Sequence, residues 1–338
     1  MDYSILSKHR TKLMGIAIVL VGIFHSSIVH INDGVDFVCF IGDMGVDIFF
    51  LVSGFGMYYT YLKNPSWKEF YWKRMFRIAP AWVLVNVLVQ VYTYWGKEVN
   101  WFSVIKCLTG FSFWLDGSLY FWYIPAALMF YLLTPCFMCG YRDNKKKAYL
   151  MVGIGWMVIL LSCLLCHNSK YFVFLFRFPV FFIGIFMGEL SHCKVPIQKK
   201  HMWLMGVCLG IGLAGEYMIK HSLVYSFIHY EYKYILYCVI AIPFYILISC
   251  FFECVKAKFS VLQFLGGITL EIYLLHEFIL KVVTSFLRKV PFDNLGIIYN
   301  LLVFMMTVLL AKLLHQLLDK VVGVYNKKIQ IAQKERMK

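Results

Sequence analysis

Long apolar blocks dominate this chain and limit how it can fold. Ten blocks are long enough to cross a bilayer, because each covers roughly 27–40 Å at about 1.5 Å per helical residue, and a hydrocarbon core is about 30 Å thick. They are residues 12–31, 35–62, 78–95, 119–138, 148–167, 171–190, 202–219, 234–253, 261–283 and 296–318. The sequence therefore predicts an all-α fold, a polytopic transmembrane helical bundle of about ten spans.

Composition supports a membrane protein. Hydrophobic residues make up 61% of the 338 residues and charged residues 15%, whereas a soluble domain has about 45–50% and about 25%. An ordinary soluble, disordered or collagen-like chain is thereby excluded. We find no internal repeat and no linker, so we predict one integral membrane domain over residues 1–338. The 11 cysteines lie almost entirely within apolar blocks, which favours small hydrophobic side chains over disulfides or metal ligands.

The distribution of positive charge predicts the orientation. The formal net charge is +15, and the polar stretches between blocks hold 23 Lys and Arg on one side of the membrane and 8 on the other. Because cytoplasmic loops carry the excess of Lys and Arg, we expect both termini in the cytoplasm. The net charge then reflects topology, and nucleic-acid binding is not expected.

Ionisable residues inside the apolar blocks are costly to retain, so they are candidates for function. His25 lies 13 residues beyond Lys12, in the outer half of the first predicted span. Asp43 and Asp47 are four residues apart and share one helical face, where Asp47 could position a catalytic group. For His25 the alternative is a neutral imidazole bonded to a backbone carbonyl. For the glycine-rich segment that carries Asp43 and Asp47, the alternative is a role in helix packing alone.

Basic residues mark the cytoplasmic mouth of the third predicted span. Arg74 and Arg77 are three residues apart and form a fork suited to phosphate oxygens, beside Lys73. The alternative is a helix anchor on anionic lipid headgroups.

Further polar groups lie in later spans. Trp122 and Tyr123 precede Pro125, which we expect to disturb the helix and free carbonyls to line a cavity. Arg177 lies about six residues into its span, too deep for a simple anchor, although snorkelling is an alternative. Glu271 and His276 are about 140° apart around a helix, so at least one of them is expected to be structural.

Together these residues describe a polar path, with basic groups at the inner entrance, carboxylates at mid-depth and histidines toward the outer face. Such a path suits a phosphate-bearing donor held from inside and an acceptor that comes from outside. Histidine is the side chain best able to take a proton from a hydroxyl near neutral pH. Metal-ligand spacings, nucleotide-binding glycine loops and a nucleophile elbow are lacking, so we expect no metal cofactor.

Five motifs in order carry a family resemblance. They are GIAIVL at 15–20 with FH at 24–25, GVDIFFLVSGF at 45–55, KRMFRIAP at 73–80, FYLLTP at 130–135 and LEIYLLH at 270–276. In this order the motifs resemble the acyltransferase-3 family of integral membrane O-acyltransferases. The resemblance implies transfer of an acyl group, usually acetyl, from cytoplasmic acyl-CoA to a hydroxyl on an extracytoplasmic carbohydrate or similar acceptor. It also implies the bacterial cytoplasmic membrane and partners in polysaccharide assembly.

The resemblance also implies site residues. The family's catalytic histidine falls on His25, as a general base or an acyl carrier, and Arg74 and Arg77, with Lys73, fall on its acyl-CoA phosphate site. Asp47 and Glu271 would orient the imidazole or the acceptor. The acceptor site would include Trp122, Tyr123, Arg177 and His276. Family members often carry Arg or Lys where this chain has Met14, and Lys12 or Arg10 could replace it.

Two other functions compete with this hypothesis. A transporter or flippase for a polyol or lipid-linked sugar would use the same intramembrane charges as a substrate path, but it predicts two related halves that the sequence lacks. A structural assembly protein would have no reason to retain a path of polar groups through the bilayer. The acceptor itself stays open among exopolysaccharide, lipid-linked oligosaccharide, wall glycan and a small secreted metabolite.

Overall fold

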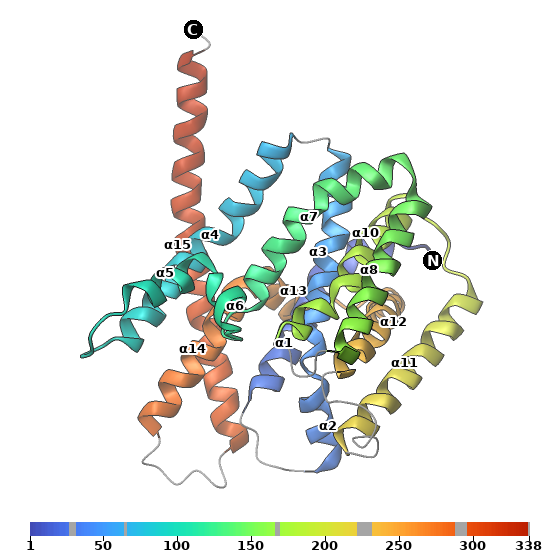
Figure 1. The fold of residues 1–338 in the computed structure, drawn as a ribbon, viewed down its shortest axis with the longest axis horizontal. Helices are drawn as coiled ribbons and strands as arrows, with labels where there is room; N and C mark the ends of the chain where they lie inside the picture. The colour runs from blue at the N-terminus through green and yellow to red at the C-terminus, as the bar shows by residue number, and fades with distance from the viewer. Residues whose placement is uncertain (27–31, 64–65, 166–169, 222–231, 288–295, 337–338) are drawn as a thin grey trace. The chain divides into compact units, whose positions relative to one another are not determined.

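The computed structural model describes residues 1–26, 32–63, 66–165, 170–221, 232–287 and 296–336 (Figure 1). Within these residues the chain is helical apart from turns, short loops and a backbone bridge between Asp2 and Pro196. The helices are α1 (Ser4–His25), α2 (Asp33–Ile41), α3 (Met44–Leu62), α4 (Trp67–Thr93), α5 (Trp101–Thr109), α6 (Phe111–Asp116), α7 (Tyr123–Asp143), α8 (Lys145–Leu165), α9 (Phe172–Leu175), α10 (Phe178–His192), α11 (Lys199–Lys220), α12 (Lys233–Val255), α13 (Ser260–Gly267), α14 (Thr269–Leu287) and α15 (Gly296–Arg336). The all-α prediction is confirmed.

Six helical segments among the described residues are long and apolar enough to cross a membrane. They are Trp67–Thr93, Tyr123–Asp143, Phe172–His192, Lys199–Lys220, Lys233–Val255 and Ile298–Val321. The prediction of several transmembrane helices is confirmed, while the count of ten and the cytoplasmic termini stay predictions. Residues 27–31 and 166–167 of the predicted spans lie outside the described residues.

The chain forms two compact units. Unit 1 comprises residues 1–26, 30–73 and 109–267, and unit 2 comprises 27–29, 74–108 and 268–338. The chain passes between them several times, so neither unit is one continuous stretch of sequence. The prediction of a single domain over residues 1–338 stays a prediction.

Three predicted spans are each divided into two helices. The block 35–62 forms α2 and α3, 171–190 forms α9 and α10, and 261–283 forms α13 and α14. Pro179, which follows Phe178 at the start of α10, explains the second break, because proline has no backbone N–H and its ring clashes with the preceding turn. At the first break, Gly42, Gly45 and Val46 donate to carbonyls three residues back, which is the tighter 3₁₀ pattern.

Close backbone contacts hold unit 1 together. A β-carbon added at Gly54 of α3 would lie 1.9 Å from the carbonyl oxygen of Phe181 in α10. One added at Gly15 of α1 would lie 2.0 Å from the carbonyl oxygen of Leu262 in α13. Only glycine permits these approaches. Gly54 belongs to the glycine-rich segment after Asp43, so that segment does serve helix packing, while Gly15 is a second close approach that the sequence did not predict.

Unit 2 is built from the end of α4, α5, α14 and α15. The indole Nε1 of Trp82 donates to the carbonyl of Leu108 at 2.8 Å, and the hydroxyls of Tyr92 and Ser285 lie 2.8 Å apart. The first bond joins α4 to the end of α5, and the second joins α4 to α14. These polar bonds between helices fix their mutual positions inside the unit.

Candidate active site

A buried ion network lies at the centre of unit 1. Nε of Arg177 is 2.9 Å from Oδ2 of Asp47, and Nη2 is 3.0 Å from Oδ2 of Asp43. Nη1 of the same guanidinium donates to the carbonyl of Val173 at 2.9 Å. Arg177 and Asp47 are fully buried. The guanidinium therefore has a partner on each nitrogen, which offsets much of the cost of burying its charge.

The helix breaks place these charges. Arg177 is the residue before α10, and Asp43 is the residue before α3, with Asp47 in the first turn of that helix. Both carboxylates thus lie at a helix N-terminus, where the dipole favours negative charge. The prediction that Asp43 and Asp47 share a face is confirmed. The alternative interpretation, that Arg177 snorkels toward a membrane surface, is wrong, because its side chain is enclosed by protein.

Aromatic rings surround the guanidinium. Its central carbon lies 5.0 Å from the ring centre of Trp122, 4.7 Å from that of Tyr234 and 5.9 Å from that of Tyr237. These distances are within the range of cation–π attraction. The structure thus brings together three of the predicted site residues, Asp47, Trp122 and Arg177. Whether Arg177 binds substrate stays a prediction.

Tyr123 begins α7 and contacts the same core. Its ring centre lies 4.9 Å from that of Phe50 and 5.9 Å from that of Phe49, both on α3. Pro125 is the third residue of the helix, where the backbone N–H would have no partner in the helix anyway. The expected disturbance of the helix at Pro125 is therefore wrong.

Two further buried charges escaped the sequence reasoning. Lys233 at the start of α12 is buried, with its ammonium 5.5 Å from the ring centre of Phe24 and 5.4 Å from that of Phe40. Glu216 of α11 is fully buried, and within the described chain neither of its carboxylate oxygens has a hydrogen-bond partner. Glu216 is the one acidic residue in the apolar block 202–219, a signal that could have identified it.

His25 is the last residue of α1 and is half-buried. Its ring packs edge-on against Phe24, with 5.1 Å between the centres. Phe24 in turn reaches the turn before α3, because a β-carbon added at Gly42 would lie 3.1 Å from the Phe24 β-carbon. His25 therefore directly follows Phe24, whose ring lies near the Lys233 ammonium and whose β-carbon lies beside Gly42, the residue before Asp43.

In unit 2, Glu271 has an imidazole partner that the sequence reasoning did not consider. Nδ1 of His315 in α15 lies 2.7 Å from Oε1 of Glu271, and Nε2 lies 3.4 Å from Oδ2 of Asp319. The expectation that Glu271 orients an imidazole thus has an observed candidate in His315. Its role in catalysis stays a prediction.

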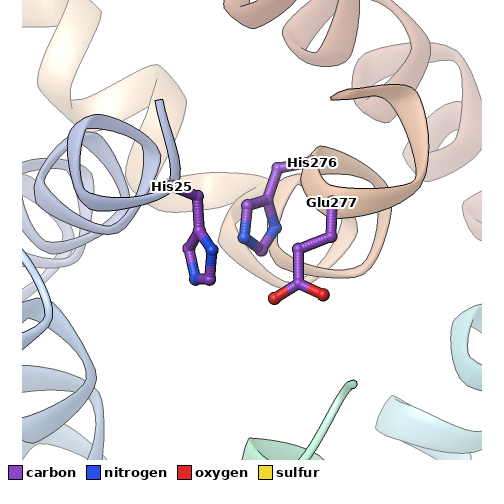
Figure 2. A group of neighbouring side chains, drawn as sticks. All are labelled: His25, His276 and Glu277. Carbon is purple, nitrogen blue, oxygen red and sulfur yellow. The ribbon is translucent and has the colours of Figure 1, made fainter. Parts of the chain in front are cut away.

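His276 has a different partner from Glu271, as their separation around the helix implies. Its Nδ1 donates to the carbonyl of Tyr273 at 2.6 Å on the same helix, and this bond fixes the ring's orientation. Figure 2 shows the imidazole of His276 and the carboxylate of Glu277 projecting from consecutive positions of α14. Glu277, which directly follows the motif at 270–276, is a further ionisable group that was not among the predicted site residues.

The basic residues at the start of α4 differ in their surroundings. Nζ of Lys73 is 2.5 Å from Oε1 of Glu69, one helical turn earlier. Arg74 is half-buried and Arg77 is exposed. The two arginines are three residues apart in one continuous helix, as the phosphate-fork interpretation requires. Their role in binding the donor stays a prediction.

Lys12, the possible replacement for a basic residue at Met14, is held within unit 1. Its ammonium lies 5.3 Å from the ring centre of Phe252 and 5.7 Å from that of Phe259, and it donates to the carbonyl of Ala257 at 3.4 Å. These contacts direct the side chain toward the end of α12 and the loop that follows.

Comparison with known proteins identifies the family. The model of the acyltransferase-3 family, described as an acyltransferase domain, matches residues 13–315. No curated protein and no solved structure matches the chain. The matched region begins in α1 before His25 and ends in α15 at His315, so it contains every predicted site residue. The chain belongs to the acyltransferase-3 family.

Proposed function

We propose that this protein is a membrane O-acetyltransferase of the bacterial cytoplasmic membrane. It transfers the acetyl group of cytoplasmic acetyl-CoA to a hydroxyl of an extracytoplasmic carbohydrate. The observation that carries the proposal is the family match over residues 13–315, and the six apolar helices support the membrane setting. Partners in polysaccharide assembly would supply or export the acceptor.

His25 acts as the general base in the proposed reaction. It takes the proton of the acceptor hydroxyl as that oxygen attacks the thioester carbonyl, so that a C–O bond forms and the C–S bond breaks. The imidazolium then gives its proton to the departing thiolate, which leaves as free CoA. Histidine suits both steps because its ordinary pKa lies close to neutral pH. An acetyl-imidazole on His25 is the alternative route. In its first step a C–N bond to the imidazole forms as the C–S bond breaks and CoA leaves, and in its second step the acceptor oxygen forms the C–O bond as the C–N bond breaks and the hydroxyl proton passes to the imidazole.

The ion network of unit 1 supports the position of the histidine. Arg177 joins the segment before α10 to the first turn of α3 through Asp43 and Asp47. The turn that carries Asp43 packs against Phe24 of α1. Fixing this turn therefore also fixes the end of α1, and a general base needs a defined position to act. In this proposal Asp47 acts through position and has no direct contact with the acetyl group.

The choice of a carbohydrate as the acceptor is based on the aromatic and charged side chains at the centre of unit 1. Trp122 and Tyr123 lie beside and at the start of α7, and the Trp122 ring contacts the Arg177 guanidinium, which pairs with Asp43 and Asp47. Aromatic faces pack against apolar C–H faces, and carboxylates accept hydrogen bonds from hydroxyls. A carbohydrate offers both groups.

A donor assay tests the proposed function directly. Purified protein in a bilayer, given acetyl-CoA labelled in the acetyl group, should bind the donor and release free CoA only when a hydroxylated acceptor is present. The label should appear as an ester on the acceptor. A transporter or flippase would give neither CoA release nor an ester, so that outcome would contradict the proposal.

Substituting Arg74 or Arg77 by alanine should raise the acetyl-CoA concentration needed for half-maximal rate. Hydrogen bonds to charged groups contribute about 1.5–3 kcal/mol, so each change should raise KM for the donor by about 10–100-fold, with a smaller effect on kcat. Steady-state kinetics with varied acetyl-CoA measure this. Lys68→Ala, an exposed cation one to two turns earlier in the same helix, is the matched control. Unchanged KM in both arginine variants would return these residues to the lipid-anchor interpretation.

A further inference from the structure

An apolar groove opens on the surface of unit 1 between α11 and α12. Its volume is about 520 Å³, which is within the size range of sites for small organic ligands. It is lined by Lys199, Met202, Trp203, Gly206, Val207 and Leu247. Leu247 comes from α12 and the other five residues come from α11.

Gly206 lies beside open space in the groove. A β-carbon at Gly206 would meet no atom within 4 Å, so the missing side chain leaves open space beside Trp203 and Val207. Trp203 is 77% exposed, and only 17% of the most apolar stretch of α11 is buried inside the protein. For a helix that crosses a membrane, this outer surface is in contact with lipid, and the groove is a recess in it.

One end of the groove carries positive charge. Lys199 lines it, and Lys200 follows directly in the first turn of α11. Both lysines are exposed, and within the described residues neither forms an ion pair with a carboxylate. The start of a membrane-spanning helix lies near the lipid headgroups, where each such lysine attracts anionic lipid by about 1 kcal/mol.

We propose that this groove is a binding site for one anionic phospholipid. Part of an acyl chain lies over Gly206, between Trp203 and Leu247, and the phosphate lies at Lys199 and Lys200. The combination of an apolar recess and unpaired cations at one end selects a ligand with an apolar chain and an anionic head. The site is separate from the proposed reaction, so it stands whether or not the protein transfers acetyl groups.

Lipid binding to the purified protein tests the charge requirement. Mass spectrometry of the intact protein from detergent, titrated with phosphatidylglycerol or phosphatidylcholine of identical chains, gives the affinity of each lipid. We expect the anionic lipid to bind more tightly, by about fivefold for each lysine. In Lys199→Gln with Lys200→Gln this preference should disappear. Equal affinity of the two lipids for the unaltered protein would overturn the proposal.

A pair of glycine variants tests the groove itself. Gly206→Leu fills the recess and should weaken binding of both lipids by tenfold or more. Gly210→Leu is the matched control, because Gly210 lies one turn further along α11, also meets no atom within 4 Å and does not line the groove. Both substitutions replace glycine by leucine in the same helix, so they raise helix propensity equally. If Gly206→Leu binds phosphatidylglycerol as tightly as Gly210→Leu does, the groove is not the site.

Discussion

His25→Ala should reduce the rate of acetyl transfer by about 10²–10⁴-fold, which is the usual contribution of a general base. The loss should fall on kcat, because the imidazole acts on the hydroxyl proton during reaction. If His25 instead carries the acetyl group, the variant should show no transfer above background. The release of CoA from labelled acetyl-CoA, with saturating donor and acceptor, measures the effect.

The control for this prediction is His192→Ala. His192 is also a histidine at the end of a helix in unit 1, but it is exposed, and its ring lies near those of Tyr58 and Tyr59. The His192→Ala variant should keep full activity. Both variants should elute from size-exclusion chromatography as the unaltered protein does. Full activity in well-folded His25→Ala would remove the imidazole from the mechanism.

Arg177→Met should destabilise unit 1 more than any other single change discussed here. The substitution keeps an apolar side chain of similar length but leaves Asp43 and Asp47 without their cation. Breaking a buried ion pair in this way costs about 3–5 kcal/mol, because a charge stays buried without compensation. The midpoint of thermal unfolding in detergent, followed by the loss of the monodisperse peak, should fall sharply. Arg142→Met, at an exposed position in the last turn of α7, should leave the midpoint unchanged.

A triple variant separates charge from packing. Arg177→Met combined with Asp43→Asn and Asp47→Asn removes all three charges and keeps similar volumes. Replacing a buried ion pair by uncharged groups is often neutral in stability, so we expect the midpoint to recover most of its loss. If the triple variant unfolds as early as Arg177→Met alone, the guanidinium is needed for its shape and hydrogen bonds, and the charge argument is wrong.

Helix content and the residues that share one polar face of a helix could be predicted from the sequence. The apolar blocks predicted helices because their length and polarity match a bilayer, and the spacing of Asp43 and Asp47 predicted a shared face. The break at Phe176–Arg177 was also accessible, since Pro179 marks the start of a new helix. No local pattern indicates that this break directs Arg177 toward the first turn of α3.

Partners far apart in the sequence could not be predicted. His315 lies 44 residues from Glu271, and no local pattern links the two positions. Lys233 stands at the edge of the apolar block 234–253, so the sequence places it among the eight loop cations on the outer side. In the structure it is buried against Phe24 and Phe40. A single sequence gives helix positions and faces, while pairings between helices depend on how the segments assemble.

The Arg177 network has a consequence for biosynthesis. Asp43 and Asp47 are synthesised about 130 residues before Arg177, and aspartates can enter hydrocarbon as neutral acids, whereas arginine stays cationic. The later segment can therefore settle in the bilayer only beside the earlier one. Assembly then requires the first turn of α3 to stay accessible in the nascent protein until the segment that carries Arg177 has been synthesised.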